Sequence, residues 1–197
     1  MSVIAQAGTK GRQLHKFGGS SLADVKCYLR VAGIMAEYSQ PGDMMVVSAA
    51  GSTTNQLISW LKLSQTDRLS AHQVQQALRR YQSDLISGLL PADMADTLTQ
   101  AFIHDLERLA ALLDRGITDA VYAEVVGHGE IWSARLMSAV LNLQGMESAW
   151  LDARDFLRAE RGPQPQVNEG LSYPLLQQLL VQHPNKRTVV TGFICRN

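Results

Sequence analysis

The sequence predicts an α/β fold in which helices sandwich a mainly parallel sheet and a helical hairpin is inserted between two of the strands. Short apolar runs, typical of strands buried on both faces, alternate with segments whose apolar residues recur at helical spacing. Between residues 70 and 116 only the helical spacing occurs, which predicts the inserted hairpin. A chain of 197 residues that is 46% hydrophobic suits one globular domain, or a large piece of one.

The chain begins with a polar, glycine-containing stretch, and we expect residues 1–12 to form a flexible lead-in. A first strand is predicted over 13–17 and a first helix over 22–39, which a Pro-Gly pair at 41–42 ends. Residues 21–24 match the capping pattern [ST]-x-x-[DE]. The first helix is therefore expected to start just after two adjacent glycines.

A second strand is predicted over 44–49, followed by a junction of small polar residues at 50–55 and a helix over 57–63. The inserted hairpin spans 70–116, and Pro91 opens its second helix. The apolar stripes of the two hairpin helices are assigned to core packing. They are Val74, Leu78, Tyr81 and Leu85, and then Leu98, Phe102, Leu106, Leu109 and Leu113.

Thr118 is expected to cap a further helix, which Gly127-His128-Gly129 interrupts and which resumes over 130–143. Glu130 and Ser133 then share one helical face, where a carboxylate can accept a hydrogen bond from a ligand ammonium group. The alternative is a solvated first-turn glutamate favoured by the helix dipole. His128 is expected to be a loop histidine, and no metal-binding spacing of histidines occurs in the sequence.

A third strand over 148–153, a surface loop over 161–169, a helix over 173–182 and a fourth strand over 187–194 complete the alternation. Three of the predicted strands end in glycine or in serine and threonine loops. Ligands of α/β sheets bind at the carboxyl ends of strands, so the loops after the first and second strands are expected to face one crevice. The chain stops directly after a strand of the buried type, and we therefore expect it to be a fragment.

The first of these loops is the candidate for binding an anion. Gly18 and Gly19 lack Cβ atoms, so their N–H groups can approach an oxygen closely, and Lys16 adds a positive charge. Phosphate suits this arrangement, to which Ser20 and Ser21 add hydroxyl groups. The alternative is a tight turn whose glycines only relieve steric strain, because the pattern is neither a P-loop nor a dinucleotide fingerprint.

Composition excludes several classes of function. Eighteen basic residues balance eighteen acidic ones, so no excess of positive charge indicates binding to nucleic acid or to an anionic membrane. Cys27 and Cys195 form neither a disulfide framework nor a zinc spacing. No signal peptide or membrane span is predicted, so a cytoplasmic protein is expected.

Several of these stretches occur in one order that closely resembles the aspartokinases. The resemblance extends from about residue 13 to the last residue, and it looks most like the kinase portion of the methionine-branch bifunctional enzymes, which also carry a homoserine dehydrogenase. It implies an amino-acid-kinase fold, present as its N-terminal half. The stretches are Lys16-Phe17-Gly18-Gly19-Ser20-Ser21, Val46-Val47-Ser48-Ala49-Ala50-Gly51, Thr54-Asn55, Gly129-Glu130-x-x-Ser133 and Thr191-Gly192-Phe193-Ile194.

The resemblance implies transfer of the γ-phosphoryl group of ATP to the β-carboxylate of L-aspartate, the first step towards lysine, threonine and methionine. Phosphoryl transfer depends on positioning and charge stabilisation more than on covalent help from the protein. Mg²⁺ would arrive with the nucleotide, and no metal ligands of the protein itself are implied. The residues assigned to the ATP phosphates are Lys16, which would also be catalytic, Gly18, Gly19 and Ser20; those assigned to aspartate are Ser48, Thr54, Glu130, which would bind the α-ammonium group, and Phe193.

The sequence also departs from the family pattern. A Gly-Arg-x-Gly-Ser-Asp-type segment, whose arginine grips the substrate carboxylate and whose aspartate is catalytic, does not occur here. We therefore expect the 197 residues to hold half of the site and to show no useful kinase activity. The alternatives are another enzyme of the amino-acid-kinase group or a non-catalytic subdomain. The family implies that the parent protein is a homo-oligomer.

Overall fold

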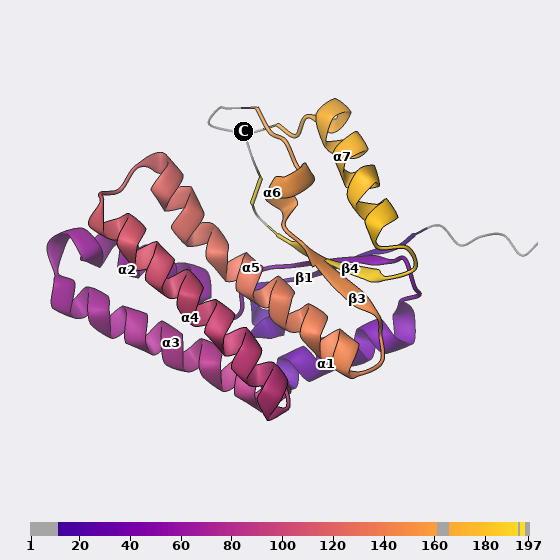
Figure 1. Ribbon diagram of the computed structural model, residues 1–197, viewed down its shortest axis with the longest axis horizontal. Coiled ribbons are helices and arrows are strands. Elements are labelled where there is room, and N and C mark those ends of the chain that lie inside the picture. The colour runs from indigo at the N-terminus through magenta and orange to yellow at the C-terminus, as the bar shows by residue number, and fades with distance from the viewer. Residues whose placement is uncertain (1–11, 161–165, 193, 196–197) are drawn as a thin grey trace, which may run out of the picture.

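The computed structural model describes residues 12–160, 166–192 and 194–195, and within them one parallel sheet lies between two layers of helices (Figure 1). The strand order is β1-β2-β4-β3, and every neighbouring pair is parallel. The predicted α/β class is confirmed. The elements are β1 (Leu14–Phe17), the 3₁₀ helix η1 (Gly19–Leu22), α1 (Val25–Tyr38), β2 (Met44–Val47), α2 (Thr53–Thr66), α3 (Arg68–Leu89), α4 (Ala92–Asp114), α5 (Asp119–Leu143), β3 (Ser148–Leu151), α6 (Ala153–Phe156), α7 (Glu169–Gln182) and β4 (Arg187–Thr191).

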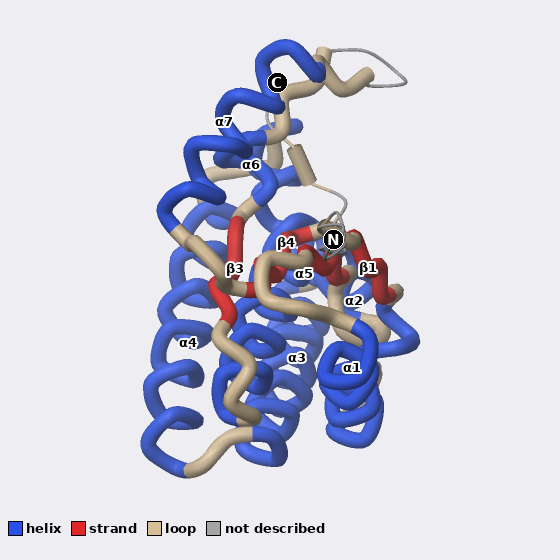
Figure 2. The backbone as a smooth tube through the Cα atoms, turned by 90° about the vertical axis from the view of Figure 1, so that its right-hand side faces the viewer, coloured by secondary structure: helices blue, strands red, loops and turns tan. Residues whose placement is uncertain are grey.

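The helices divide unevenly between the two faces of the sheet. Figure 2 shows α1, α3, α4 and α5 on one side of the strands and α6 and α7 on the other. The helices α3 and α4 form the predicted hairpin, which Pro91 opens as the N-cap of α4. None of the helices in the described part of the chain is both long and apolar enough to cross a membrane.

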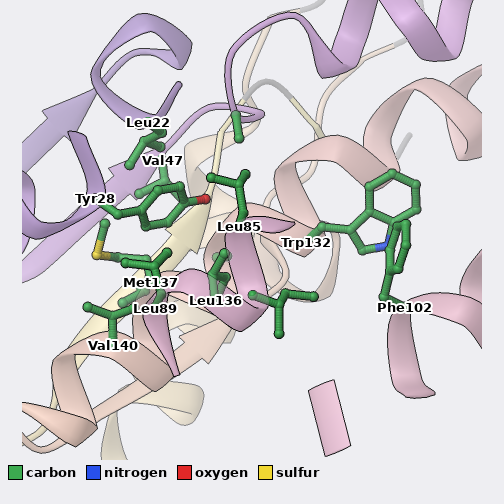
Figure 3. Close-up of a cluster of buried hydrophobic side chains, with 14 of the residues drawn as sticks. Leu22, Tyr28, Val47, Leu85, Leu89, Phe102, Trp132, Leu136, Met137 and Val140 are labelled. Atoms are coloured by element: carbon green, nitrogen blue, oxygen red, sulfur yellow. The ribbon is translucent and has the colours of Figure 1, made fainter. Parts of the chain in front are cut away.

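The larger hydrophobic core lies between the sheet and α1–α5. Tyr28 and Met137 are fully buried there, and the ring of Phe102 packs edge-on against that of Trp132 at a centroid distance of 4.8 Å (Figure 3). Each such side chain contributes about 1.5–3 kcal/mol through burial. A smaller core on the opposite face includes Leu151, Phe156, Leu180 and Val190. The stripe residues assigned to packing from the sequence lie in or against the larger core.

The first helix differs from its prediction. Residues 19–22 form the 3₁₀ helix, and α1 begins only at Val25. The side chain of Asp24 accepts a hydrogen bond from the N–H of Cys27 at 2.8 Å, so Asp24 caps the helix in place of Ser21. The glycine pair therefore opens a single 3₁₀ turn, with Gly18 as its N-cap and Gly19 as its first residue, and the amino end of α1 is not at the glycines.

Other boundaries also differ. The helix α7 begins at Glu169 because Asn168 caps it, four residues before the predicted start. The strands β2, β3 and β4 end two or three residues earlier than predicted, because their last residues turn into the loops at the carboxyl edge of the sheet. Residues 1–11 of the predicted lead-in and residues 161–165 of the predicted loop lie outside the described part of the chain.

Candidate functional site

The carboxyl ends of β1, β2 and β4 lie side by side, and the loop after each strand continues the pairing. The N–H of Ser48 donates to the carbonyl of Phe17 at 3.1 Å, and the N–H of Gly192 donates to the carbonyl of Val47 at 2.8 Å. Because the strands are parallel and adjacent, three polar loops are held at one edge of the sheet. This is the predicted location of a ligand crevice.

The glycine turn after β1 packs directly onto the loop after β2. A Cβ atom on Gly19 would lie 2.6 Å from the carbonyl oxygen of Ala49, so only glycine fits. The N–H of Gly51 donates to the carbonyl of Gly19 at 2.9 Å and ties the two loops together. The Lys16 Nζ atom lies 3.5 Å from the point that a Gly18 Cβ atom would occupy, so its ammonium group lies over the turn.

The loop after β2 carries the hydroxyl residues that were predicted to bind aspartate. Ser48 follows the last residue of β2 and is half-buried, and Thr54 lies half-buried in the first turn of α2. Its neighbour Thr53 is fully buried and points into the protein, where its hydroxyl accepts a hydrogen bond from Gln82 at 3.0 Å. Ser20 is exposed within η1. Phe193 lies outside the described residues.

Glu130 contributes a buried carboxylate to the same place. Its side chain is 3% exposed, and its Oε1 atom accepts a hydrogen bond from the N–H of Ala49 at 3.4 Å. The Oε2 atom is buried and has no hydrogen-bond partner among the residues that the structure describes. Burial raises the pKa of Glu130 to about 7, although the Ala49 amide opposes this effect. A buried acceptor of this kind is suited to a cationic ligand group.

The helix interruption expected at Gly127–Gly129 was wrong, and so was the alternative of a solvated first-turn glutamate. The helix α5 runs without a break from Asp119 to Leu143, so Glu130 lies in the middle of a helix and is not a solvated first-turn residue. The glycines allow close packing instead of breaking the helix. A Cβ atom on Gly129 would lie 2.7 Å from the Cβ atom of Ala49, and one on Gly127 would lie 2.9 Å from the side chain of Ile194.

His128 is a buried helical residue and not a loop histidine. Its Nδ1 atom lies 2.6 Å from the carbonyl oxygen of Glu124, and its Nε2 atom lies 2.6 Å from the guanidinium of Arg108. An arginine can only donate and a carbonyl can only accept, so the proton is on Nδ1 and the ring is neutral. Burial lowers the pKa of His128, which agrees with this assignment.

His128 belongs to a charged cluster that the sequence analysis missed. Arg108 pairs with Glu124 at 2.9 Å, and Arg154 bridges Glu124 and Asp152. Burial works against ionisation of Glu124, but Arg154 and Arg108 hold its pKa below the ordinary value. The spacing of Glu124 and His128, four residues apart on one helix, is the only sequence signal for this cluster. The charged cluster links α5 to α4 through Arg108 and to the start of α6 through Arg154.

Among the residues that the structure describes, no group of three or more histidine, cysteine, aspartate or glutamate side chains could hold a metal ion. The described site instead offers a lysine, backbone amides of a glycine turn, hydroxyl groups and one buried carboxyl. These groups suit an anion on one side and a small cationic or zwitterionic molecule on the other.

The chain is similar in sequence to one family model and to several known proteins. The family model described as the amino acid kinase family matches residues 11–197. The bifunctional aspartokinase/homoserine dehydrogenase 2 of Escherichia coli (strain K12) is 87% identical over 197 residues, which are 100% of this chain and 24% of that protein. The chloroplastic bifunctional aspartokinase/homoserine dehydrogenase 2 of Arabidopsis thaliana is 31% identical over 193 residues, or 92% of this chain and 20% of that protein. The chain thus spans about a quarter or less of these relatives.

The fold has a counterpart among solved structures. The crystal structure of E. coli aspartokinase III in complex with aspartate and ADP matches with a TM-score of 0.82 at 24% sequence identity. The match covers 93% of this chain and 41% of that chain. At this level of identity, the likeness shows that the two proteins share a fold.

Proposed function

Since the chain belongs to the amino acid kinase family, we propose that it forms part of an aspartokinase, which transfers the γ-phosphoryl group of ATP to the β-carboxylate of L-aspartate. The observation that carries the proposal is the contact between three predicted motifs. Gly19, Ala49 and Glu130 meet at the carboxyl edge of the sheet through the contacts of Ala49 with both other residues. The proposed phosphate site and the proposed ammonium site would therefore be next to one another.

We assign the phosphate side to the turn after β1. The amides of Gly18 and Gly19, together with Ser20, would hold phosphate oxygens of ATP. The Lys16 ammonium lies over this turn and would stabilise the negative charge on the phosphoryl group as it moves to aspartate. Mg²⁺ would be bound by the phosphates and arrive with the nucleotide.

We assign the aspartate side to Ser48, Thr54 and Glu130, and to Phe193 by the family resemblance alone. The buried carboxylate of Glu130 would pair with the α-ammonium group, which supplies the partner that Oε2 lacks among the described residues. The hydroxyl groups would hold the carboxylates, so that an oxygen of the β-carboxylate faces the γ-phosphorus. Attack by that oxygen releases ADP.

The alternatives are a family member that acts on a different carboxylate and a subdomain without catalysis. The buried Glu130 favours an amino-acid substrate over one that lacks an ammonium group, because an unpaired buried carboxylate is costly. The bifunctional relatives also favour aspartate. Assembly of the parent protein as a homo-oligomer stays a prediction, as does a cytoplasmic location.

Binding to the 197-residue chain tests the proposal. We expect calorimetric titration to detect L-aspartate binding, and N-acetyl-L-aspartate, which lacks the ammonium group, to bind at least about ten-fold more weakly. Equal binding of the two, or no binding of aspartate, would contradict the assignment of Glu130. In a coupled assay with ATP, Mg²⁺ and aspartate we expect no useful turnover, because the arginine and aspartate implied by the family are not in this sequence. Turnover at ordinary enzyme rates would contradict that expectation.

A further inference from the structure

The helical hairpin contacts both loops of the candidate site through two consecutive residues of α3. The hydroxyl of Tyr81 donates to the carbonyl oxygen of Ala23 at 2.9 Å, and Ala23 is the residue that follows η1. The side-chain amide of Gln82 donates to the hydroxyl of Thr53 at 3.0 Å. One residue thus holds the segment after the glycine turn, and the next holds the start of α2.

The Tyr81 hydroxyl also touches the loop after β2. Gly51 has a φ of 52°, and a Cβ atom on it would lie 2.6 Å from the Tyr81 hydroxyl oxygen and 3.5 Å from the Cα atom of Ala23. Tyr81, Ala23 and Gly51 therefore meet at one point. Gly51 is also the residue whose N–H donates to Gly19 at 2.9 Å. The hydroxyl of Tyr81 therefore lies at the contact between the two loops, which we call the seam and which the Gly51–Gly19 hydrogen bond holds together.

The position of this hydroxyl is well defined. The ring of Tyr81 packs against the larger core, so the side chain has little rotational freedom. Burial raises the pKa of Tyr81, so the phenol keeps its proton and remains a donor at neutral pH. Gln82 is 3% exposed and Thr53 is fully buried, so their hydrogen bond is sheltered from water. The hairpin can thus serve as a fixed support for both loops.

We propose that Tyr81 is a positioning residue that sets the spacing between the phosphate loop after β1 and the aspartate loop after β2. The inference rests on the proposed function, and Tyr81 itself contacts neither substrate. Phosphoryl transfer requires the γ-phosphorus and the attacking carboxylate oxygen to be held about 3–3.5 Å apart, so the spacing of the two loops affects the reaction directly. Gln82 supports the second loop in the same way from the buried side.

This role predicts a specific pattern of ligand binding. A ligand that occupies one loop only does not depend on the spacing between the loops, whereas a ligand that spans both does. Removing one hydrogen bond at the seam corresponds to about 1 kcal/mol, or about five-fold in affinity. A residue that only stabilised the fold would affect all ligands alike.

The test compares Tyr81→Phe with Tyr38→Phe, a variant of an exposed tyrosine at the end of α1. Calorimetry on the 197-residue chain measures the affinity for L-aspartate, for inorganic phosphate and for the phosphonate analogue of aspartyl phosphate, which spans both loops. We expect Tyr81→Phe to bind the phosphonate about five- to ten-fold more weakly and to bind the two single ligands within about two-fold of the wild type. Tyr38→Phe should bind all three normally.

Equal binding of the phosphonate by Tyr81→Phe and the wild type would overturn the inference, as would parallel losses for all three ligands. If the wild type binds none of the three, the proposed function itself fails. Hydrogen exchange separates these cases, since it needs no ligand. We expect the Gly51 amide to exchange about five- to ten-fold faster in Tyr81→Phe while the Val189 amide of β4 stays unchanged. Unchanged exchange at Gly51 would overturn the inference.

A second variant tests the contact itself. Gly51→Ala places a methyl group against the Tyr81 hydroxyl and should weaken phosphonate binding. Adding Tyr81→Phe removes the atom that the methyl group meets at 2.6 Å, and the next ring atom lies 3.5 Å away, at ordinary contact distance. We therefore expect the double variant to bind the phosphonate more tightly than Gly51→Ala alone. Additive losses would contradict a shared contact.

Discussion

Replacing Glu130 by glutamine should make the protein more stable and less able to bind aspartate. Burial raises the pKa of Glu130 from 4.5 to about 7, so the folded state keeps a proton that the unfolded state has released. As the pH rises through this window, the unfolded state binds fewer protons than the folded state, and the free energy of unfolding falls. At about 1.4 kcal/mol per factor of ten, the loss is about 3 kcal/mol above pH 7.

Glutamine keeps the acceptor for the Ala49 N–H but cannot ionise. Its amide N–H₂ group takes the place of Oε2, which has no partner among the described residues, and this offsets part of the gain. We therefore expect Glu130→Gln to raise the free energy of unfolding by about 1–3 kcal/mol at pH 8, and its effect at pH 5 to be less favourable by about 2–3 kcal/mol. Urea unfolding followed by circular dichroism measures both values.

The affinity of the wild type for aspartate should rise with pH, whereas its free energy of unfolding falls. For a pKa of about 7, ionised Glu130 falls to about one-tenth of the protein at pH 6, so the wild type should bind aspartate about ten-fold more weakly at pH 6 than at pH 8. Glu130→Gln should bind weakly at both pH values. The control is Glu107→Gln, at an exposed position on α4. A variant that is equally destabilised at pH 5 and pH 8 would refute the reasoning, because it would show that Glu130 acts through packing and not through its charge.

Three further substitutions test the site and its supports. Lys16→Ala should weaken phosphate binding by at least about five-fold in a titration, whereas Lys62→Ala on α2 should not; equal losses would contradict a local anion site. Gly129→Ala should lower the free energy of unfolding by about 1–3 kcal/mol because its methyl group meets other atoms at 2.7 Å and 3.1 Å, while Gly33→Ala, which has open space in a helix, should raise it by about 0.5–1 kcal/mol. Arg154→Ala should cost about 1–3 kcal/mol at pH 7, since two partly buried carboxylates lose their shared partner; a thermal melt equal to that of the wild type would show that the cluster adds no stability.

The family and the strands of the sheet could be predicted from the sequence because both depend on patterns of neighbouring residues. Apolar runs and helical spacing report which face of an element is buried, and the ordered motifs report the family, which the comparisons confirm. The same patterns do not show which atoms the polar end of a side chain contacts. Tyr81 fits its apolar stripe, yet its hydroxyl extends beyond the stripe to Ala23.

The break predicted at Gly127–Gly129 was wrong for a related reason. Helix propensity counts each glycine as a weak point, but tertiary packing outweighs a cost of about 1 kcal/mol per glycine. The glycines let α5 approach the loop after β2, and this approach buries Glu130. Contacts between residues eighty positions apart have no local signal, so the buried state of Glu130 could not be predicted from its neighbours.

The close approach of α5 to the loop after β2 also limits how this protein can change. Position 129 has no room for a methyl group while position 49 carries one, so the two positions are expected to show strong epistasis. Gly129→Ala alone would place a methyl group 2.7 Å from the Cβ atom of Ala49 and 3.1 Å from the side chain of Thr53, whereas Ala49→Gly in the same chain removes the closer of these two contacts. Engineering of this pocket would therefore start from paired substitutions.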